Sequence, residues 1–143
     1  MTILLGNQYL GWIESAVAGT YTALKGQGTL TESRSQAKID TSDKTSGGYA
    51  TGAYGAVTLT QSIDIKVNLP DAGYTRLETL ALAQTPFNWQ VRKNGLAGIT
   101  PGDAVFQALV YGTITSRTFN KDGTVDAKIE LALAAAPTVD TLA

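Results

Sequence analysis

Alternating apolar and polar residues run through the middle of the chain and predict a long β-strand over Ala56–Leu69. One face of this segment carries Val57, Leu59, Ile63, Ile65, Val67 and Leu69, with Gln61 among them, and the other face is polar. Alternation with a period of two is typical of a strand that places one face on a core. At about 3.3 Å per residue, the strand is roughly 45 Å long. We therefore expect it to project beyond the compact part of the molecule.

A second alternating segment, Thr29–Asp40, lacks a conventional apolar face. Charges of both signs occupy one side, from Glu32 to Asp40, and small or hydroxyl side chains occupy most of the other. One interpretation is an exposed edge strand whose charges oppose aggregation. The other interpretation is a strand that lies between a lumen and a neighbouring subunit.

The two strands are connected by Thr41–Gly55, a segment rich in glycine, serine and threonine. It is too long for a tight hairpin turn, and connections of this length are usually functional or disordered. Its anchors are Lys44, Tyr49 and Tyr54. Because tyrosine offers a large contact area at a small entropic cost, we interpret the segment as an interface. A flexible hairpin tip is the alternative.

One helix is predicted after these strands. It begins at Pro70 or at the capping box formed by Thr75 and Glu78, and Thr85-Pro86 ends it. Its apolar face consists of Tyr74, Leu77, Leu80 and Ala81, widened by Leu82 and Ala83. A short amphipathic helix of this kind is expected to pack on one end or face of a sheet.

Further strands complete a mainly β pattern. They are expected at Ile3–Glu14, Tyr21–Lys25, Phe87–Arg92, Ala104–Phe119 with a bend at Gly112, and Thr124–Ala135 after a turn at Asn120–Gly123. The first two of these segments are expected to pair with each other. No internal repeat or domain boundary interrupts the order. The sequence thus predicts one domain over residues 1–143, mainly β, with one flanking α-helix.

Composition narrows the function. Charged residues make up 16% of the 143 positions, well below the usual ~25%, which indicates a surface partly covered by a partner subunit. The chain has neither cysteine nor histidine. Thiol and imidazole catalysis, disulfides and the common zinc sites are therefore excluded. The net charge of −1, with scattered basic residues, is not typical of a protein that holds nucleic acid tightly.

Signals for membrane insertion and export are missing from the sequence. No apolar stretch approaches the ~18 residues of a transmembrane helix. Met1–Leu10 lacks the basic start and apolar middle of a signal peptide. We therefore expect a chain that is made in a cytoplasm-like compartment and does not insert into a membrane.

Carboxylates are the remaining candidates for chemistry. A glycosidase needs two of them at a set distance, and Asp40/Asp43 and Asp126/Glu130 are close in sequence. Asp40, Asp43 and Asp64 could hold Ca²⁺ through oxygen ligands. However, most acidic domains offer such pairs, and the spacing of an EF-hand is absent. No catalytic residue, metal or cofactor is predicted.

Several segments follow one another in a recognisable order. They are Tyr21–Gly26, Ile39–Tyr49, the helix after Pro70-Asp71, the hairpin around Lys121–Gly123 and the small-residue ending Ala132–Pro137. In this order they resemble the major tail tube proteins of long-tailed (siphovirus-type) bacteriophages and of phage-like gene transfer agents. The resemblance covers nearly the whole chain, although each motif alone is loose. Two departures are Ala135-Ala136-Pro137 in place of the family's usual glycine and Gly48-Tyr49 in place of its Gly-Trp.

The resemblance implies a barrel-like β-sandwich subunit with one helix, in a virion protein that is not an enzyme and is assembled in the host cytoplasm. Six copies would close into a ring, their inner sheets would join as a shared barrel, and stacked rings would form a conduit for DNA. Tape-measure, terminator and distal tail proteins are the implied partners. The long connection would reach another subunit through Thr41, Ser42, Asp43, Lys44, Gly47, Gly48, Tyr49 and Tyr54.

Passage of DNA requires a lumen that does not hold phosphate, so its lining is expected to be neutral or acidic. The lumen candidates are Glu32, Asp40, Asp64, Asp126 and Glu130. Lys38, Lys66 and Lys128 lie on the same polar faces and are candidates for cross-strand pairs. Two alternatives to a tube subunit remain. One is another virion β-sandwich protein, such as a tail terminator, sheath component or capsid decoration protein, and the other is a barrel that binds a small ligand.

Overall fold

The structure is a computed structural model that describes residues 3–97 and 103–142. The described part contains one α-helix, α1 (Ala72–Leu82), and short 3-10 turns at Gly6–Gln8, Lys44–Ser46 and Gly95–Ala97. The strands are β1 (Leu10–Glu14), β2 (Tyr21–Ala23), β3 (Gln27–Asp40), β4 (Gly52–Lys66), β5 (Phe87–Arg92), β6 (Ala104–Phe119), β7 (Val125–Leu133) and β8 (Val139–Asp140). The expected mainly β fold with one helix is confirmed.

All these strands belong to one antiparallel sheet in the order β2-β1-β5-β6-β7-β4-β3, with β8 paired to β6 beside this path. The sheet curls, so that β1 comes close to β3 although other strands separate them in the order. The side chain of Gln27 on β3 connects the two strands. It accepts a hydrogen bond from the Gly11 N–H on β1 at 2.8 Å and donates one to the Gly11 carbonyl at 2.9 Å. One curled sheet therefore provides the layers of the expected sandwich.

The core lies between the curled sheet and α1. Its completely buried side chains include Ile13 of β1, Ile63 of β4, Trp89 of β5 and Ile129 of β7. α1 adds Leu77, which is also completely buried. Burial of each such side chain stabilises the fold by about 1.5–3 kcal/mol relative to exposure. Buried and exposed residues thus alternate along β4 and β7, as the sequence pattern predicts for strands with one face on the core.

α1 begins directly after Asp71, which caps it, and not at Pro70 or at the Thr75 capping box. Asp71 Oδ1 accepts from the Gly73 N–H at 3.1 Å, and its Oδ2 accepts from the distant Lys25 N–H at 2.9 Å. The apolar face is also narrower than expected. Leu82 and Ala83 are exposed, because the helix ends here and Leu80 is its last side chain that packs on the core.

Strand boundaries differ from the expected ones where pairing decides them. β4 begins at Gly52, before the predicted Ala56, because Asp40 of β3 pairs opposite Gly52. The connection between the strands is therefore 41–51, and Tyr54 lies on a strand. At the N-terminus, only Leu10–Glu14 of the predicted 3–14 segment is a strand. On β6 the irregularity falls between residues 114 and 116, not at the predicted Gly112.

Candidate assembly surfaces

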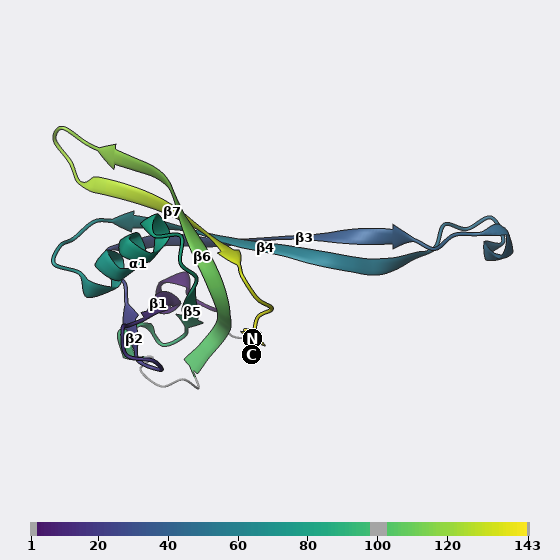
Figure 1. The fold of residues 1–143 in the computed structure, drawn as a ribbon, viewed down its shortest axis with the longest axis horizontal. Coiled ribbons are helices and arrows are strands. Elements are labelled where there is room, and N and C mark those ends of the chain that lie inside the picture. Colours follow the sequence, from purple (N-terminus) through teal and green to yellow (C-terminus); the bar gives the residue numbers. More distant parts are fainter. Residues whose placement is uncertain (1–2, 98–102, 143) are drawn as a thin grey trace.

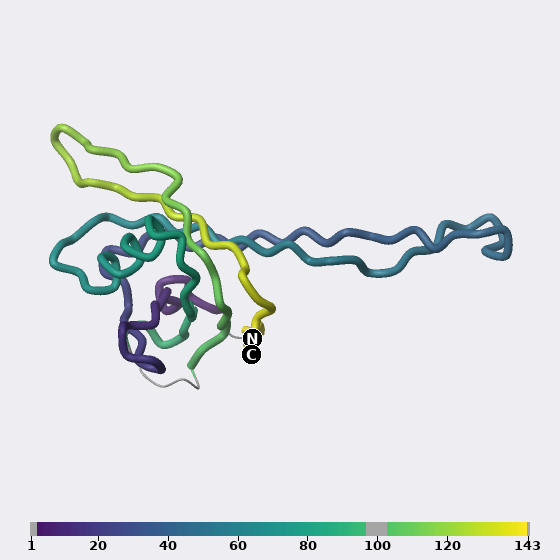
Figure 2. Tube along the Cα trace, viewed as in Figure 1, coloured from purple at the N-terminus to yellow at the C-terminus, as the bar shows by residue number. Residues whose placement is uncertain are grey.

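The most prominent feature of the molecule is a long hairpin. Figure 1 shows β3 and β4 leaving the body together, and Figure 2 follows both strands side by side to the tip. β7 pairs with β4 only from Thr60 to Lys66. From Gly52 to Leu59, β4 pairs with β3 alone within the described part of the chain, and β3 is the edge of the sheet. Free strand edges of this kind are templates for pairing with another chain.

Asp43 gives the hairpin tip a defined shape. It caps the turn Lys44–Ser46, and its Oδ1 accepts from the Thr45 N–H at 2.8 Å and from the Thr45 hydroxyl at 2.6 Å. These hydrogen bonds hold the pKa of the Asp43 carboxyl below its ordinary value. Gly47 and Gly48 follow with φ of +65° and +82°, a backbone conformation that favours glycine.

A second set of contacts closes the base of the tip. The Thr41 N–H donates to the Thr51 carbonyl at 3.0 Å, and the Thr51 N–H donates to Ser42 Oγ at 2.7 Å. Asp40 Oδ1 accepts from the Ser42 N–H at 2.8 Å, and this bond lowers the pKa of Asp40. The tip thus has a specific hydrogen-bonded conformation.

Large apolar side chains on the hairpin face solvent. Tyr49 at the tip is 78% exposed and Tyr54 on β4 is 84% exposed. Ile39 and Val57 on the neighbouring strand segments are also exposed. Side chains of this size gain free energy when they are buried against a partner. The exposed aromatic residues and the free strand edges therefore lie on the same projecting element.

One face of the β6-β7-β4-β3 sheet is polar. Asp64 lies opposite Lys128, Lys66 opposite Asp126, and Ser62 opposite Glu130. Hydroxyl residues extend this face over the neighbouring strands at Thr31, Ser33, Ser35, Thr113, Ser116 and Thr118. Because α1 and the buried side chains lie on the other face, the polar face is the outer surface of this part of the sheet.

The five acidic residues selected from the sequence lie in two places. Asp64, Asp126 and Glu130 share the polar outer face. Glu32 and Asp40 lie on the opposite face of the hairpin, because Glu32 is paired opposite the buried Gln61 and Asp40 follows the same alternation along β3. Asp40 also lies at the far end of the hairpin, away from the body.

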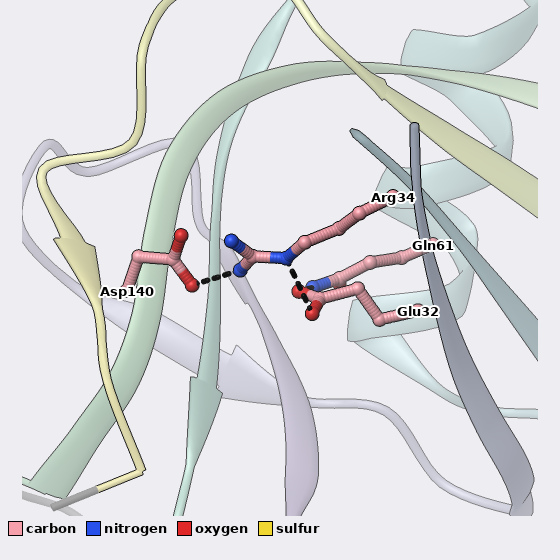
Figure 3. Close-up of polar contacts among 4 residues, drawn as sticks. All are labelled: Glu32, Arg34, Gln61 and Asp140. Atoms are coloured by element: carbon pink, nitrogen blue, oxygen red, sulfur yellow. Dashed lines mark hydrogen bonds and ion pairs between the residues drawn. The ribbon is translucent and has the colours of Figure 1, made fainter. Parts of the chain in front are cut away.

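A chain of polar side chains connects the core to the base of the hairpin. The buried Trp89 Nε1 donates to Gln61 Oε1 at 3.0 Å. Figure 3 shows the chain from Gln61 onward, where Gln61 Nε2 donates to Glu32 Oε1 at 3.3 Å. Arg34 Nε donates to Glu32 Oε2 at 3.1 Å, and Arg34 Nη2 forms an ion pair with Asp140 on β8. The hydrogen bond to Asp140 raises the pKa of Arg34 most, and the hydrogen bond to Glu32 raises it further.

Sequence reasoning missed this polar chain. Its one visible signal is Gln61, the single polar residue on an otherwise apolar strand face. Arg34 and Asp140 are 106 positions apart, and no local pattern brings them together. In the described residues no three metal-binding side chains gather into a potential metal site, so Asp40, Asp43 and Asp64 do not form the calcium site considered above.

Comparison with known structures identifies the fold. The tail of an empty gene transfer agent particle, solved with C6 symmetry, matches with a TM-score of 0.75 at 18% identity over 97% of this chain and 100% of the other. The virion of a native gene transfer agent gives 0.71 at 18% identity, over 94% and 97%. The SPP1 tail tube gives 0.70 at 15% identity, over 98% and 83%. No curated protein matches the chain.

The described residues contain no helix that is long and apolar enough to cross a membrane. A family model described as phage tail tube protein matches residues 6–139. This range includes the projecting hairpin, the polar outer face and all members of the polar chain except Asp140. The match thus covers nearly the whole chain, and so do the sequence motifs that resemble this family. The chain belongs to the phage tail tube protein family.

Proposed function

We propose that this chain is a single-domain structural subunit that closes into six-membered rings, which stack into a hollow tube for the passage of DNA. The observation that carries the proposal is the β3-β4 hairpin, which exposes unpaired strand edges and two tyrosines outside the body. The sixfold symmetry reported for the gene transfer agent tail supports the ring number.

Sheet continuation between subunits explains how such a ring is held together. A strand edge is stabilised when another strand supplies its hydrogen-bond partners, and a closed barrel leaves no edge exposed. In this account β3 and the distal half of β4 receive strands from neighbouring copies. A rotation that relates successive copies closes the ring, and a second contact along the axis builds the filament.

The polar outer face of β6-β7-β4-β3 is our candidate for the lumen lining. Asp64, Asp126 and Glu130 place carboxylates there, and Lys66 and Lys128 lie directly opposite two of them across the strands. A lysine opposite a carboxylate attracts phosphate less strongly than an isolated lysine does, because the neighbouring negative charge repels the phosphate. DNA therefore slides along a surface that offers hydroxyl groups and balanced charge.

The hairpin tip is our candidate for contact between rings. Its ordered turn at residues 41–51 presents Lys44 and Tyr49, and Tyr54 lies just behind it on β4. We assign the chain a structural role in the virion tail and no catalytic one. We further propose assembly in the host cytoplasm, with tape-measure, terminator and distal tail proteins at the interior and the two ends of the tube.

Electron microscopy across a concentration series, alongside size-exclusion chromatography, tests this function. Hollow tubes with a regular axial repeat are expected. The double change Tyr49→Ser and Tyr54→Ser should raise the concentration needed for assembly by about tenfold or more, because buried interface tyrosines typically contribute 1 kcal/mol or more each. The matched control is Tyr111→Ser on the body, which should assemble like the wild type.

Two outcomes would overturn the proposal. A protein that stays monomeric at all concentrations would favour a ligand-binding or decoration role. Single capped rings that never stack would favour a terminator. Unchanged assembly of the double tyrosine variant would remove the hairpin from the contact and leave the function itself intact.

A further inference from the structure

The base of the hairpin spans a groove. The groove has a volume of about 450 Å³ and is lined by residues of β3, β4, β5, β6 and the C-terminal segment. Its lining is mainly apolar, with Leu30, Val91 and Phe106 among the residues, and Arg34 and Asp140 add charges to it. Leu30 and Leu59 still pack the hairpin base on the core, but the groove leaves open space beside them. The Arg34–Asp140 ion pair bridges this open space in addition to that packing.

The two ends of this bridge belong to different parts of the fold. Asp140 lies on β8, which is paired with β6 opposite Phe106. Backbone bonds on both sides hold β8 in place, from the Thr138 N–H to the Gln107 carbonyl at 2.8 Å and from the Thr141 N–H to the Val105 carbonyl at 2.9 Å. Asp140 is thus anchored to the body.

Arg34 belongs to the hairpin. It lies on the core-side face of β3, opposite Leu59, and its guanidinium reaches across to Asp140 while it also holds Glu32 (Figure 3). Beyond this point β3 continues to Asp40, roughly 20 Å further at about 3.3 Å per residue. A small rotation at Arg34 therefore becomes a large displacement at the tip, so a contact here controls where the tip points.

We propose that Arg34 and Asp140 form a clamp that sets the direction of the hairpin in the free subunit. In this role Arg34 is a positioning residue. It holds the hairpin in one orientation before a neighbour is present, so that less conformational freedom is lost when subunits join. The consequence for assembly rests on the proposed function above, whereas the clamp itself is a property of the unassembled chain.

The clamp is also adjustable by salt. The side chains of Arg34 and Asp140 remain 45% and 33% exposed, and partly exposed ion pairs are weakened by dissolved ions. At 1 M salt the screening length falls to about 3 Å. We therefore expect high salt to loosen the hairpin without unfolding the body.

Spin-label distance measurement in the dilute, monomeric protein tests the clamp. The chain has no cysteine, so Ala50→Cys at the tip and Thr79→Cys on α1 provide two unique labels. In Arg34→Gln or Asp140→Asn, the population outside the main distance should rise roughly fivefold, the factor for about 1 kcal/mol.

Arg117→Gln is the matched control. Arg117 pairs with Glu78 at 3.5 Å, and both side chains are 36% exposed, but this pair connects β6 to α1. The control should leave the tip distance unchanged. The clamp is refuted if Arg34→Gln and Asp140→Asn retain the wild-type distribution, or if Arg117→Gln broadens it equally. Neither result depends on whether tubes form, so the clamp and the proposed function fail separately.

Discussion

A single buried amide, that of Gln61, joins the core to the hairpin. Its Oε1 is the acceptor for Trp89 Nε1, and both side chains are buried. If a buried donor loses its acceptor, the folded protein is destabilised, because the donor has left water and gained no hydrogen bond in return. Gln61 therefore interrupts the apolar face of β4 for a structural reason, and its polarity is required where the pattern favours leucine.

Replacing Gln61 tests this role. We expect Gln61→Leu to lower the free energy of unfolding by about 1–3 kcal/mol, because Trp89 Nε1 is then buried without an acceptor. Denaturant unfolding of the monomeric protein provides the measurement. Gln36→Leu, an exposed change on the same hairpin, is the control and should stay within about 0.5 kcal/mol of the wild type. Equal effects of the two changes would contradict the account.

Asp43 offers a test at acid pH. Hydrogen bonds from Thr45 depress its pKa, so the folded tip binds a proton less readily than the unfolded chain does. Its contribution to tip order is therefore complete above the ordinary pKa and is lost as pH falls through the lowered value. We predict that the Thr45 amide signal in an NMR titration changes with a midpoint below 3.8, the ordinary value.

The variant Asp43→Asn supplies the control for that titration. The Thr45 amide should no longer respond to pH in this range, because the titrating group is gone. A midpoint at or above 3.8 in the wild type would mean that the hydrogen bonds to Asp43 do not persist in solution.

At the scale of elements, α1 depends on a contact that its own sequence does not contain. Asp71 accepts from Gly73 within the first turn and from Lys25 on the approach to β3. It thus ties the start of the helix to the edge of the sheet. Pro70 and the Thr75 capping box are reasonable local signals, but Asp71 satisfies two N–H groups at once, one in the helix and one far along the chain.

Removing this cap should be costly. Asp71→Ala is expected to lower the free energy of unfolding by about 2 kcal/mol, since a lost N-cap and a lost buried acceptor each contribute about 1 kcal/mol. Thermal or denaturant unfolding measures the effect. Thr75→Ala is the control, and it should be neutral or slightly stabilising because alanine favours the helix interior. The assignment of Asp71 is wrong if Thr75→Ala is the more harmful change.

Local pattern predicted the strands well and their ends poorly. Alternation marks β4 and β7 because each puts one face on the core, a property of the strand itself. In contrast, β4 extends back to Gly52 because β3 pairs with it, although glycine and alanine there have no strand pattern. The bulge near Thr115 likewise depends on pairing with Lys128. Pairing between distant segments cannot be predicted from a short stretch of sequence.

The same limit applies to the candidate site. The exposed tyrosines and the polar strand faces could be selected from the sequence, because composition and alternation signal them directly. The split between Glu32 and Asp64 could not, since it requires the register of β3 on β4. Nor could the ion pair of Arg34 with Asp140, which depends on the curl of the whole sheet.

For the whole molecule, the hairpin is the unusual part. An isolated two-stranded ribbon is marginally stable in water. Beyond the end of β7, however, β3 and β4 form such a two-stranded ribbon (Figure 1). The low charged fraction of the chain, 16%, fits a surface that partner subunits cover. Both features are explained at once if neighbouring copies complete the sheet and bury the tyrosines.

Cryo-electron microscopy of the assembled protein tests this central claim most directly. The account predicts sixfold rings in which each hairpin leaves its own subunit, pairs with another copy and buries Tyr49 and Tyr54, with Asp64, Asp126 and Glu130 lining the lumen. Tubes whose hairpins lie free in solvent, or whose lumen is lined by the opposite sheet face, would contradict it.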